Sequence, residues 1–167
     1  MVRLFSFLLP KPALTIVVDV EGKEVTLAPL PAIVSPQPQL PTPLPPEPEV
    51  DSGGLVSVPL ETLAFGRSGD KGDKVNIGII ARRPEYLPWI AAALTRERVE
   101  TFFSHFLRPG QAQPVQRFYL PGTHALNFLL HDILAGGGVA SLRTDPQGKC
   151  YAQLLLTELI TLPQDLL

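Results

Sequence analysis

The apolar positions of this chain fall into two zones, separated by a long stretch of prolines. In the first zone, two runs rich in β-branched residues, 14–20 and 24–27, flank Glu21-Gly22-Lys23. Runs of this kind around a glycine turn predict a β-hairpin. Because an isolated hairpin is only marginally stable in water, we expect it to pack on the rest of the chain or on a partner.

The stretch between the two zones carries eight prolines from Pro31 to Pro48. Proline removes backbone donors and favours extended polyproline geometry, so this composition predicts a semi-rigid linker. A peptide ligand for a proline-reading domain is the alternative, but the stretch holds few basic residues to fix its orientation. We therefore divide the chain into an N-terminal hairpin segment at 1–30, a proline-rich linker at 31–54 and a folded domain at 55–167.

In the second zone, alternating and helical periodicities follow one another between glycine and proline breaks. An apolar stripe at Val99, Phe102, Phe103 and Phe106 indicates a helix that begins at Thr95 and is ended by Pro109-Gly110. Thr123 has the character of a helix N-cap. The remaining expected elements are strands at 56–65, 75–81, 115–120, 140–143 and 149–160, and helices at 85–93 and 123–134.

This order of elements is β-β-α-β-α-β, with an additional strand arm at the end. Each helix has one apolar stripe to bury, so the economical solution is a mostly antiparallel sheet of about four strands with both helices on one face. The sequence therefore predicts an α+β sandwich of the ferredoxin-like kind, preceded by the hairpin and the proline-rich linker.

Composition narrows the function classes. The chain has 167 residues, and a net charge of −2 argues against a nucleic-acid partner held by broad electrostatics. Cys150 is the single cysteine, which excludes an internal disulfide and a cysteine-cluster metal site. The apolar start is too short for a signal peptide, and no run approaches the length needed to span a bilayer. We expect a soluble, cytoplasmic protein with no membrane partner.

A glycine-rich run at residues 66–78 predicts a tight polar loop between two strands, where functional residues often lie. A solvated hairpin turn explains the same composition. The run lacks the Gly-Lys-Ser/Thr ending of a phosphate-binding loop, the spacing of a dinucleotide fingerprint and the acidic residues of a calcium loop. What remains is a turn with exposed amides beside Lys71, a combination suited to an anion.

Other chemistries find weaker support. We expect His124, His131 and Asp132 on one helix, where the histidines are seven residues apart and do not share one metal ion, so no metal site is predicted. Ser68 lacks the surroundings of a hydrolase nucleophile, and Cys150 is expected in the core. The glycines at 136–138 would stop a helix and allow a close backbone approach.

Six short motifs occur in order along the folded domain: residues 67–72, 76–78, 117–122, 125–128, 136–138 and 141–149. Together they resemble the C-terminal domain of the AtuA family, which is associated with acyclic terpene utilisation in bacteria. The resemblance implies a ferredoxin-like fold. Residues 3–11 and 18–22 are similar to the tail of the larger domain that precedes this one in two-domain members, which implies a truncated relative or a fragment.

Two functions remain open. The favoured one is an accessory or interaction domain of acyclic terpene or acyl-CoA catabolism, which docks on a larger AtuA-type domain or on a second copy. The alternative is a small enzyme domain that binds an acyl-CoA or a carboxylate through the glycine-rich run. No catalytic residue and no cofactor is assigned. The candidate ligand-binding residues, most of them carried by the resemblance, are Arg67, Ser68, Asp70, Lys71, Asn76, Arg117, Asn127 and Arg143.

Overall fold

The computed structural model describes residues 5, 7–28, 43–48 and 53–167 of the chain. The chain divides into two compact units, Leu4–Pro41 and Thr42–Leu167. Of the expected linker, residues 31–42 and 49–52 lie outside the described residues. None of the helices in the described ranges is long and apolar enough to cross a bilayer.

The smaller unit contains the predicted hairpin. Strands β1 (Ile16–Val20) and β2 (Lys23–Leu27) pair antiparallel and follow a short 3₁₀ turn, η1 (Lys11–Ala13). The side chain of Asp19 accepts a hydrogen bond from the backbone N–H of Gly22 at 2.8 Å, which closes the turn. Every residue of both strands is exposed, so the hairpin has no core of its own.

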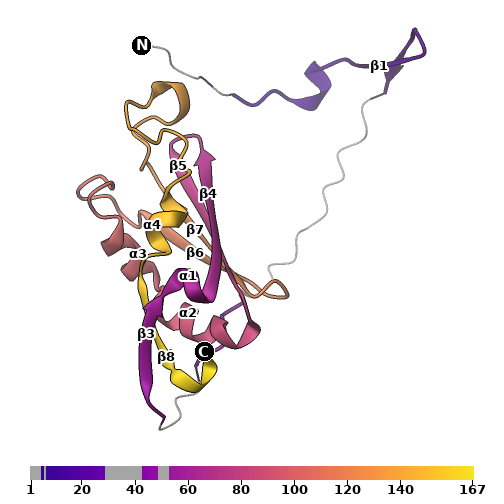
Figure 1. Cartoon of the computed structure of the whole chain (residues 1–167). Helices are drawn as coiled ribbons and strands as arrows, with labels where there is room; N and C mark the ends of the chain where they lie inside the picture. The colour runs from indigo at the N-terminus through magenta and orange to yellow at the C-terminus, as the bar shows by residue number, and fades with distance from the viewer. Residues whose placement is uncertain (1–4, 6, 29–42, 49–52) are drawn as a thin grey trace. The chain divides into compact units, whose positions relative to one another are not determined.

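The larger unit is built on a four-stranded antiparallel sheet (Figure 1). Its strands are β4 (Ala64–Lys71), β5 (Lys74–Ala81), β6 (Val115–Leu120) and β7 (Ala125–Leu130), in the order β4-β5-β7-β6. Along β5 and β7 alternate apolar residues are fully buried, among them Ile77 and Phe128. This alternation is what a sheet with one covered face requires.

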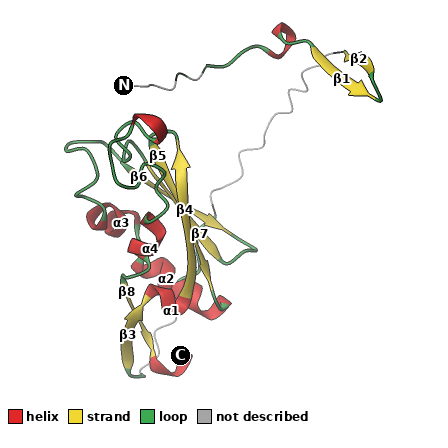
Figure 2. Cartoon of the chain, turned by 45° about the horizontal axis from the view of Figure 1, so that its top comes forward, coloured by secondary structure: helices red, strands yellow, loops and turns green. Residues whose placement is uncertain are grey.

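Helices cover one face of this sheet (Figure 2). The helical layer contains η2 (Pro84–Tyr86), α2 (Leu87–Ala93), α3 (Arg96–Phe102) and α4 (Tyr151–Leu155). The helices bury Leu87, Ile90, Val99 and Leu155 in the same apolar cluster as the inward-facing strand residues. The predicted ferredoxin-like α+β architecture, with a four-stranded antiparallel sheet and helices on one face, is confirmed.

A separate two-stranded ribbon joins the two ends of the domain. Strand β3 (Leu55–Pro59) pairs antiparallel with β8 (Leu159–Pro163), and α1 (Leu60–Leu63) leads from β3 into β4. The predicted strand at 56–65 is therefore wrong in its continuity, because a helical turn interrupts it. Leu60 and Leu63 of that turn are both fully buried, so core packing decides the local conformation.

Three further predictions on secondary structure are wrong. Residues 123–134 do not form a helix: Thr123 and His124 lie in the turn between β6 and β7, and the apolar run that follows is strand β7. The expected arm at 149–160 is split into α4 and β8, and the expected arm at 140–143 is replaced by η3 (Gly138–Ala140) and irregular chain. Short apolar runs fit a strand and a buried helix equally well, so periodicity alone did not separate them.

Candidate functional site

The sheet has a second face that the helices leave uncovered. Strand register places every second residue of β4, β5, β7 and β6 on it, and we call this surface the open face. Four large apolar side chains on it keep between 41% and 56% of their surface accessible. The residues of the open face are Phe65, Arg67, Gly69 and Lys71 of β4, Lys74, Asn76, Gly78 and Ile80 of β5, Ala125, Asn127 and Leu129 of β7, and Gln116, Phe118 and Leu120 of β6.

The open face changes from apolar to basic along the strands. At one end Phe65 lies opposite Ile80, and Leu120 of β6 occupies the same row two strands away. At the other end the facing residues are Lys71 and Lys74. Phe65 and Lys71 are six positions apart on an extended strand, a distance of about 20 Å. The surface can therefore contact the two ends of an amphiphilic molecule separately.

Polar groups occupy the centre of the open face. The side-chain amide of Asn76 donates a hydrogen bond to the Asn127 side-chain carbonyl at 2.9 Å, and both residues are half-buried. Gly78 lies beside this pair, and a Cβ at that position would meet only the carbonyl oxygen of Arg67, at 3.9 Å. The absence of a side chain leaves room for a ligand group over the amide pair.

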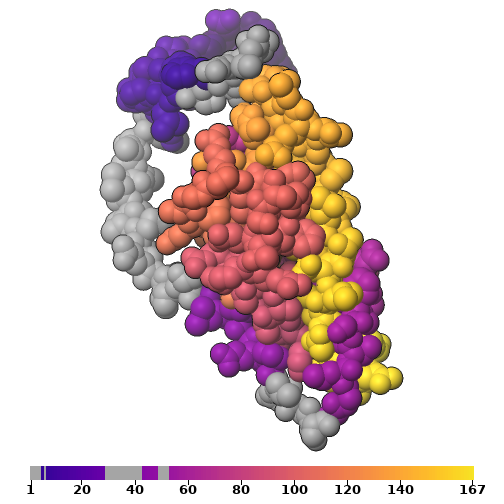
Figure 3. Space-filling model, turned by 90° about the vertical axis from the view of Figure 1, so that its left-hand side faces the viewer, coloured from indigo at the N-terminus to yellow at the C-terminus, as the bar shows by residue number. Residues whose placement is uncertain are grey.

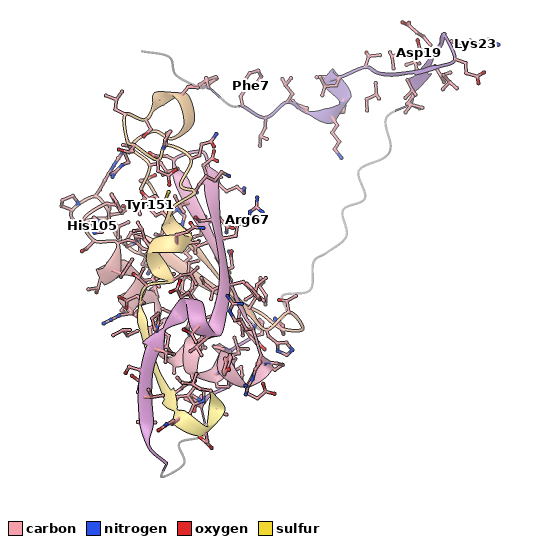
Figure 4. All side chains as sticks on the ribbon, viewed as in Figure 1. Phe7, Asp19, Lys23, Arg67, His105 and Tyr151 are labelled. Atoms are coloured by element: carbon pink, nitrogen blue, oxygen red, sulfur yellow. The ribbon has the colours of Figure 1, made fainter. Side chains whose placement is uncertain are left out.

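Cationic side chains gather around this centre. Arg67 projects from β4 on the side away from Tyr151, which belongs to the helical layer (Figure 4). Lys149 comes from the loop before α4, and its Nζ lies 3.0 Å from the point where a Cβ of Gly69 would stand. Because Gly69 belongs to the open face, this glycine gives Lys149 access to the surface that carries Arg67.

None of the basic side chains at this surface has a carboxylate partner within 4.0 Å among the described residues. Lys71 and Lys74 even stand directly opposite one another, an arrangement that destabilises an antiparallel pair. Arg82 follows β5 and stacks on Phe65, with its guanidinium carbon 3.8 Å from the ring centre. Arg82 thus stands at the apolar end, where it also donates to the carbonyl oxygen of Glu61 at 3.0 Å. The basic residues of the centre and of the basic end are Arg67, Lys71, Lys74 and Lys149. A chain of net charge −2 thus concentrates positive charge on this surface.

The sequence predicted that the glycine-rich run at 66–78 forms a loop, and this prediction is wrong. Residues up to Lys71 continue strand β4, and only Gly72-Asp73 form the turn to β5. The Asp73 carboxylate accepts a hydrogen bond from the backbone N–H of Leu134 at 3.0 Å. A Cβ on Gly137 would stand 2.0 Å from the carbonyl oxygen of Gly72, so the expected close approach of the glycine triplet is confirmed.

Ser68 points to the other side of β4 and is only 6% exposed. Its hydroxyl donates to the carbonyl oxygen of Lys149 at 3.1 Å and accepts from the N–H of Ala152 at 2.9 Å. These two bonds fix the start of α4, and with it the backbone of Lys149, against the sheet. Asp70 lies on the same side of β4 as Ser68, and its carbonyl oxygen accepts a bond from the Lys71 ammonium at 3.2 Å.

The two remaining arginines are engaged in the helical layer. Arg117 donates to the carbonyl oxygens of Ala91 at 2.8 Å and Leu94 at 3.0 Å, at the C-terminal end of α2. Arg143 donates to the carbonyl oxygen of Phe106 at 3.1 Å and lies over the ring of the same residue. The structure therefore brings Arg67, Lys71, Asn76 and Asn127 together on the open face and separates Arg117 and Arg143 from them.

One titratable group of the helical layer is perturbed. Burial raises the pKa of Tyr151; the charge of Arg143 opposes this effect and that of Asp145 adds to it. This phenol stays neutral at physiological pH and stacks on Phe103, so its role is packing.

The histidines and the cysteine do not form a reactive group. His124 precedes β7 and His131 follows it, rather than sharing one helix, and the Nε2 of His131 is 3.2 Å from the side-chain oxygen of Gln116. Cys150 is exposed, which corrects the expectation of a core position. Within the described ranges, no group of three or more His, Cys, Asp or Glu side chains is arranged to hold a metal ion.

Sequence reasoning missed Lys74, Arg82 and Lys149 as site residues. Lys149 lies within one of the six motifs and Lys74 lies between two of them, but side-chain direction is not readable from a motif. The position of Lys149 could not be predicted from the sequence, because its contact with Gly69 joins residues that are 80 positions apart in the chain.

The fold and the open face define an α+β domain of the ferredoxin-like class, with a basic, glycine-bearing sheet surface. A family model described as AtuA ferredoxin-like domain matches residues 58–161, well over half of the chain. The chain belongs to this family. Neither the curated proteins nor the solved structures contain a match to it.

Proposed function

We propose that this AtuA-like domain is an accessory binding module whose open face holds an anionic ligand. The observation that carries the proposal is that the basic side chains of the centre and of the basic end have no carboxylate partner in the described residues and share one face with the half-buried amide pair. Unpaired like charges cost stability, and an anion bound between them offsets this cost.

The ligand class follows from the two ends of the surface. Arg67 and Lys149 supply charged donors for a carboxylate or phosphate oxygen. The exposed side chains of Phe65, Ile80 and Leu120 offer apolar area at the opposite end. An acyl-CoA or a free acyl carboxylate has this combination of anionic and apolar parts. The association of the family with acyclic terpene utilisation is consistent with such a ligand, and we place the module in acyl-CoA catabolism.

The test is calorimetric titration of the full chain with a medium-chain acyl-CoA, the matching free fatty acid and free CoA. Arg67→Ala and Lys149→Ala each remove one charge from the open face, and each is expected to weaken binding about tenfold, a difference of about 1.4 kcal/mol. Arg83→Ala is the matched control, because Arg83 stacks on Tyr86 and pairs with Glu85 instead.

Comparison of the three ligands shows whether the site binds the phosphates of CoA or the carboxylate of the fatty acid. Binding of CoA alone would assign the site to phosphate, and binding of the fatty acid alone would assign it to a carboxylate. Absence of binding to all three, or an equal loss in the Arg83→Ala control, would contradict the proposal.

A second candidate function is docking on another protein, and the hairpin favours it. The side of the hairpin formed by Ile16, Val18, Val25 and Leu27 is apolar, and each of these residues is between 38% and 55% exposed. The partner would be a larger AtuA-type domain, and Val18→Asp would abolish their co-purification. Retention of the complex by this variant would contradict the docking function and leave the anion site untouched.

A further inference from the structure

Part of the proline-rich stretch lies on the domain. Residues 43–48 belong to the same compact unit as the sheet and helices. Figure 3 shows them in purple against the pink atoms of the helical layer. Leu44, Pro45, Pro46, Glu47 and Pro48 line one side of a cavity of ≈ 490 Å³, whose other side is formed by Ala91, Ala92, Thr95 and Arg117.

The burial of this stretch has the period of a polyproline helix. Pro45 and Pro48 are half-buried, whereas Pro43, Leu44, Pro46 and Glu47 are exposed. A polyproline II helix has three residues per turn, so residues three apart face the same way. Pro45 and Pro48 therefore form the inner edge of the stretch, and Pro43 and Pro46 lie on another edge.

The surface beneath them suits such a ligand. Ala91 and Ala92 are small and allow close approach, and Arg117 is held in place by its bonds to the end of α2. Glu47 and Arg117 line the same cavity with opposite charges. A proline-rich chain has few donors, so it covers the region beside edge strand β6 without extending the sheet.

We propose that the groove formed by α2, Thr95 and Arg117 is a polyproline-binding site, occupied in cis by residues 43–48. The stretch then binds to the domain, in addition to connecting it to the hairpin. This proposal is independent of the open face, because it involves the helical layer and the opposite edge of the sheet from β4.

The experiment compares two variants of the full chain by methyl NMR of alanine and threonine side chains. Pro45→Gly with Pro48→Gly removes both inner rings, whereas the control Pro43→Gly removes an exposed ring that does not line the cavity. We expect the Ala91, Ala92 and Thr95 methyl signals to shift in the first variant and to keep their positions in the second. A peptide of residues 42–49 added to the first variant should restore the original signals.

Equal shifts in both variants, or no shift in either, would overturn the proposal. Failure of the peptide to restore the signals would do the same. Unchanged methyl signals from the rest of the domain, including Ala152 of α4, verify that both variants are folded.

Discussion

At the scale of single residues, neighbours on β4 have opposite roles because a strand alternates its side chains. Arg67 reaches the open face, and Ser68 is buried against α4, where its hydroxyl makes two hydrogen bonds. Both residues belong to one motif, so the motif mixes a candidate ligand contact with a structural bond. Arg117 and Arg143 also lie within motifs, but each has a structural role, because it donates to backbone carbonyl oxygens of the helical layer.

Ser68→Ala is expected to lower the free energy of unfolding by about 1–3 kcal/mol, because it leaves the buried N–H of Ala152 without its partner. Urea denaturation measures this change. The substitution should also weaken acyl-CoA binding slightly, since it frees the backbone of Lys149. An unchanged denaturation midpoint would show that the two bonds contribute nothing to stability.

At the scale of elements, the β4–β5 hairpin is held by backbone packing against the glycine triplet. The carbonyl of Gly72 approaches Gly137 so closely that no side chain fits there. Gly148 is similarly confined, because its Cβ would lie 2.6 Å from a methyl group of Val75. These contacts fix the position of the loop that contains Lys149 and of the turn between Lys71 and Lys74.

Gly137→Ala should therefore destabilise the domain by about 3 kcal/mol or more, a value typical of severe steric conflict. Gly138→Ala is the matched control: its φ of 47° is also in the left-handed region, but nothing lies within 4 Å of its Cβ position. We expect the control to cost only about 1 kcal/mol. Equal Tm values for the two variants would contradict the close packing of the two turns.

The elements also show where local patterns fail. The hairpin at 14–27 was predictable because its glycine turn and β-branched runs act locally. Strand β7 was mistaken for a helix because Thr123 resembles an N-cap and the run 125–130 is almost wholly apolar. Pairing with β5 on one side and β6 on the other makes this run a central strand. That pairing is non-local and leaves no signal in the run itself.

At the scale of the whole molecule, charge is distributed unevenly. The net charge is −2, yet the open face carries basic side chains without acidic partners in the described part of the chain. Under the proposed function, this segregation lowers stability in exchange for anion binding, as functional sites commonly do. The ordinary ion pairs lie elsewhere, for example between Arg98 and Glu158 at 2.6 Å.

Lys74→Glu tests whether the like charges lower stability and support binding, because it replaces the Lys71–Lys74 pair by a pair of opposite charges. We expect the free energy of unfolding to rise by about 0.5–1 kcal/mol while acyl-CoA affinity falls. Lys23→Glu makes the same charge change opposite Val20 of the hairpin and should alter neither quantity. If Lys74→Glu lowers both stability and affinity, the basic end is structural.

The sequence by itself determined the family, the ferredoxin-like class and the N-terminal hairpin, because motif order, element order and turn chemistry are all properties of the linear chain. Only the tertiary structure decided which motif residues meet. Strand register placed Arg67 beside Asn76 and Asn127, and the packing of the α4 loop over Gly69 added Lys149. Side-chain direction depends on pairing between distant segments, and that pairing is settled by the burial of the common core.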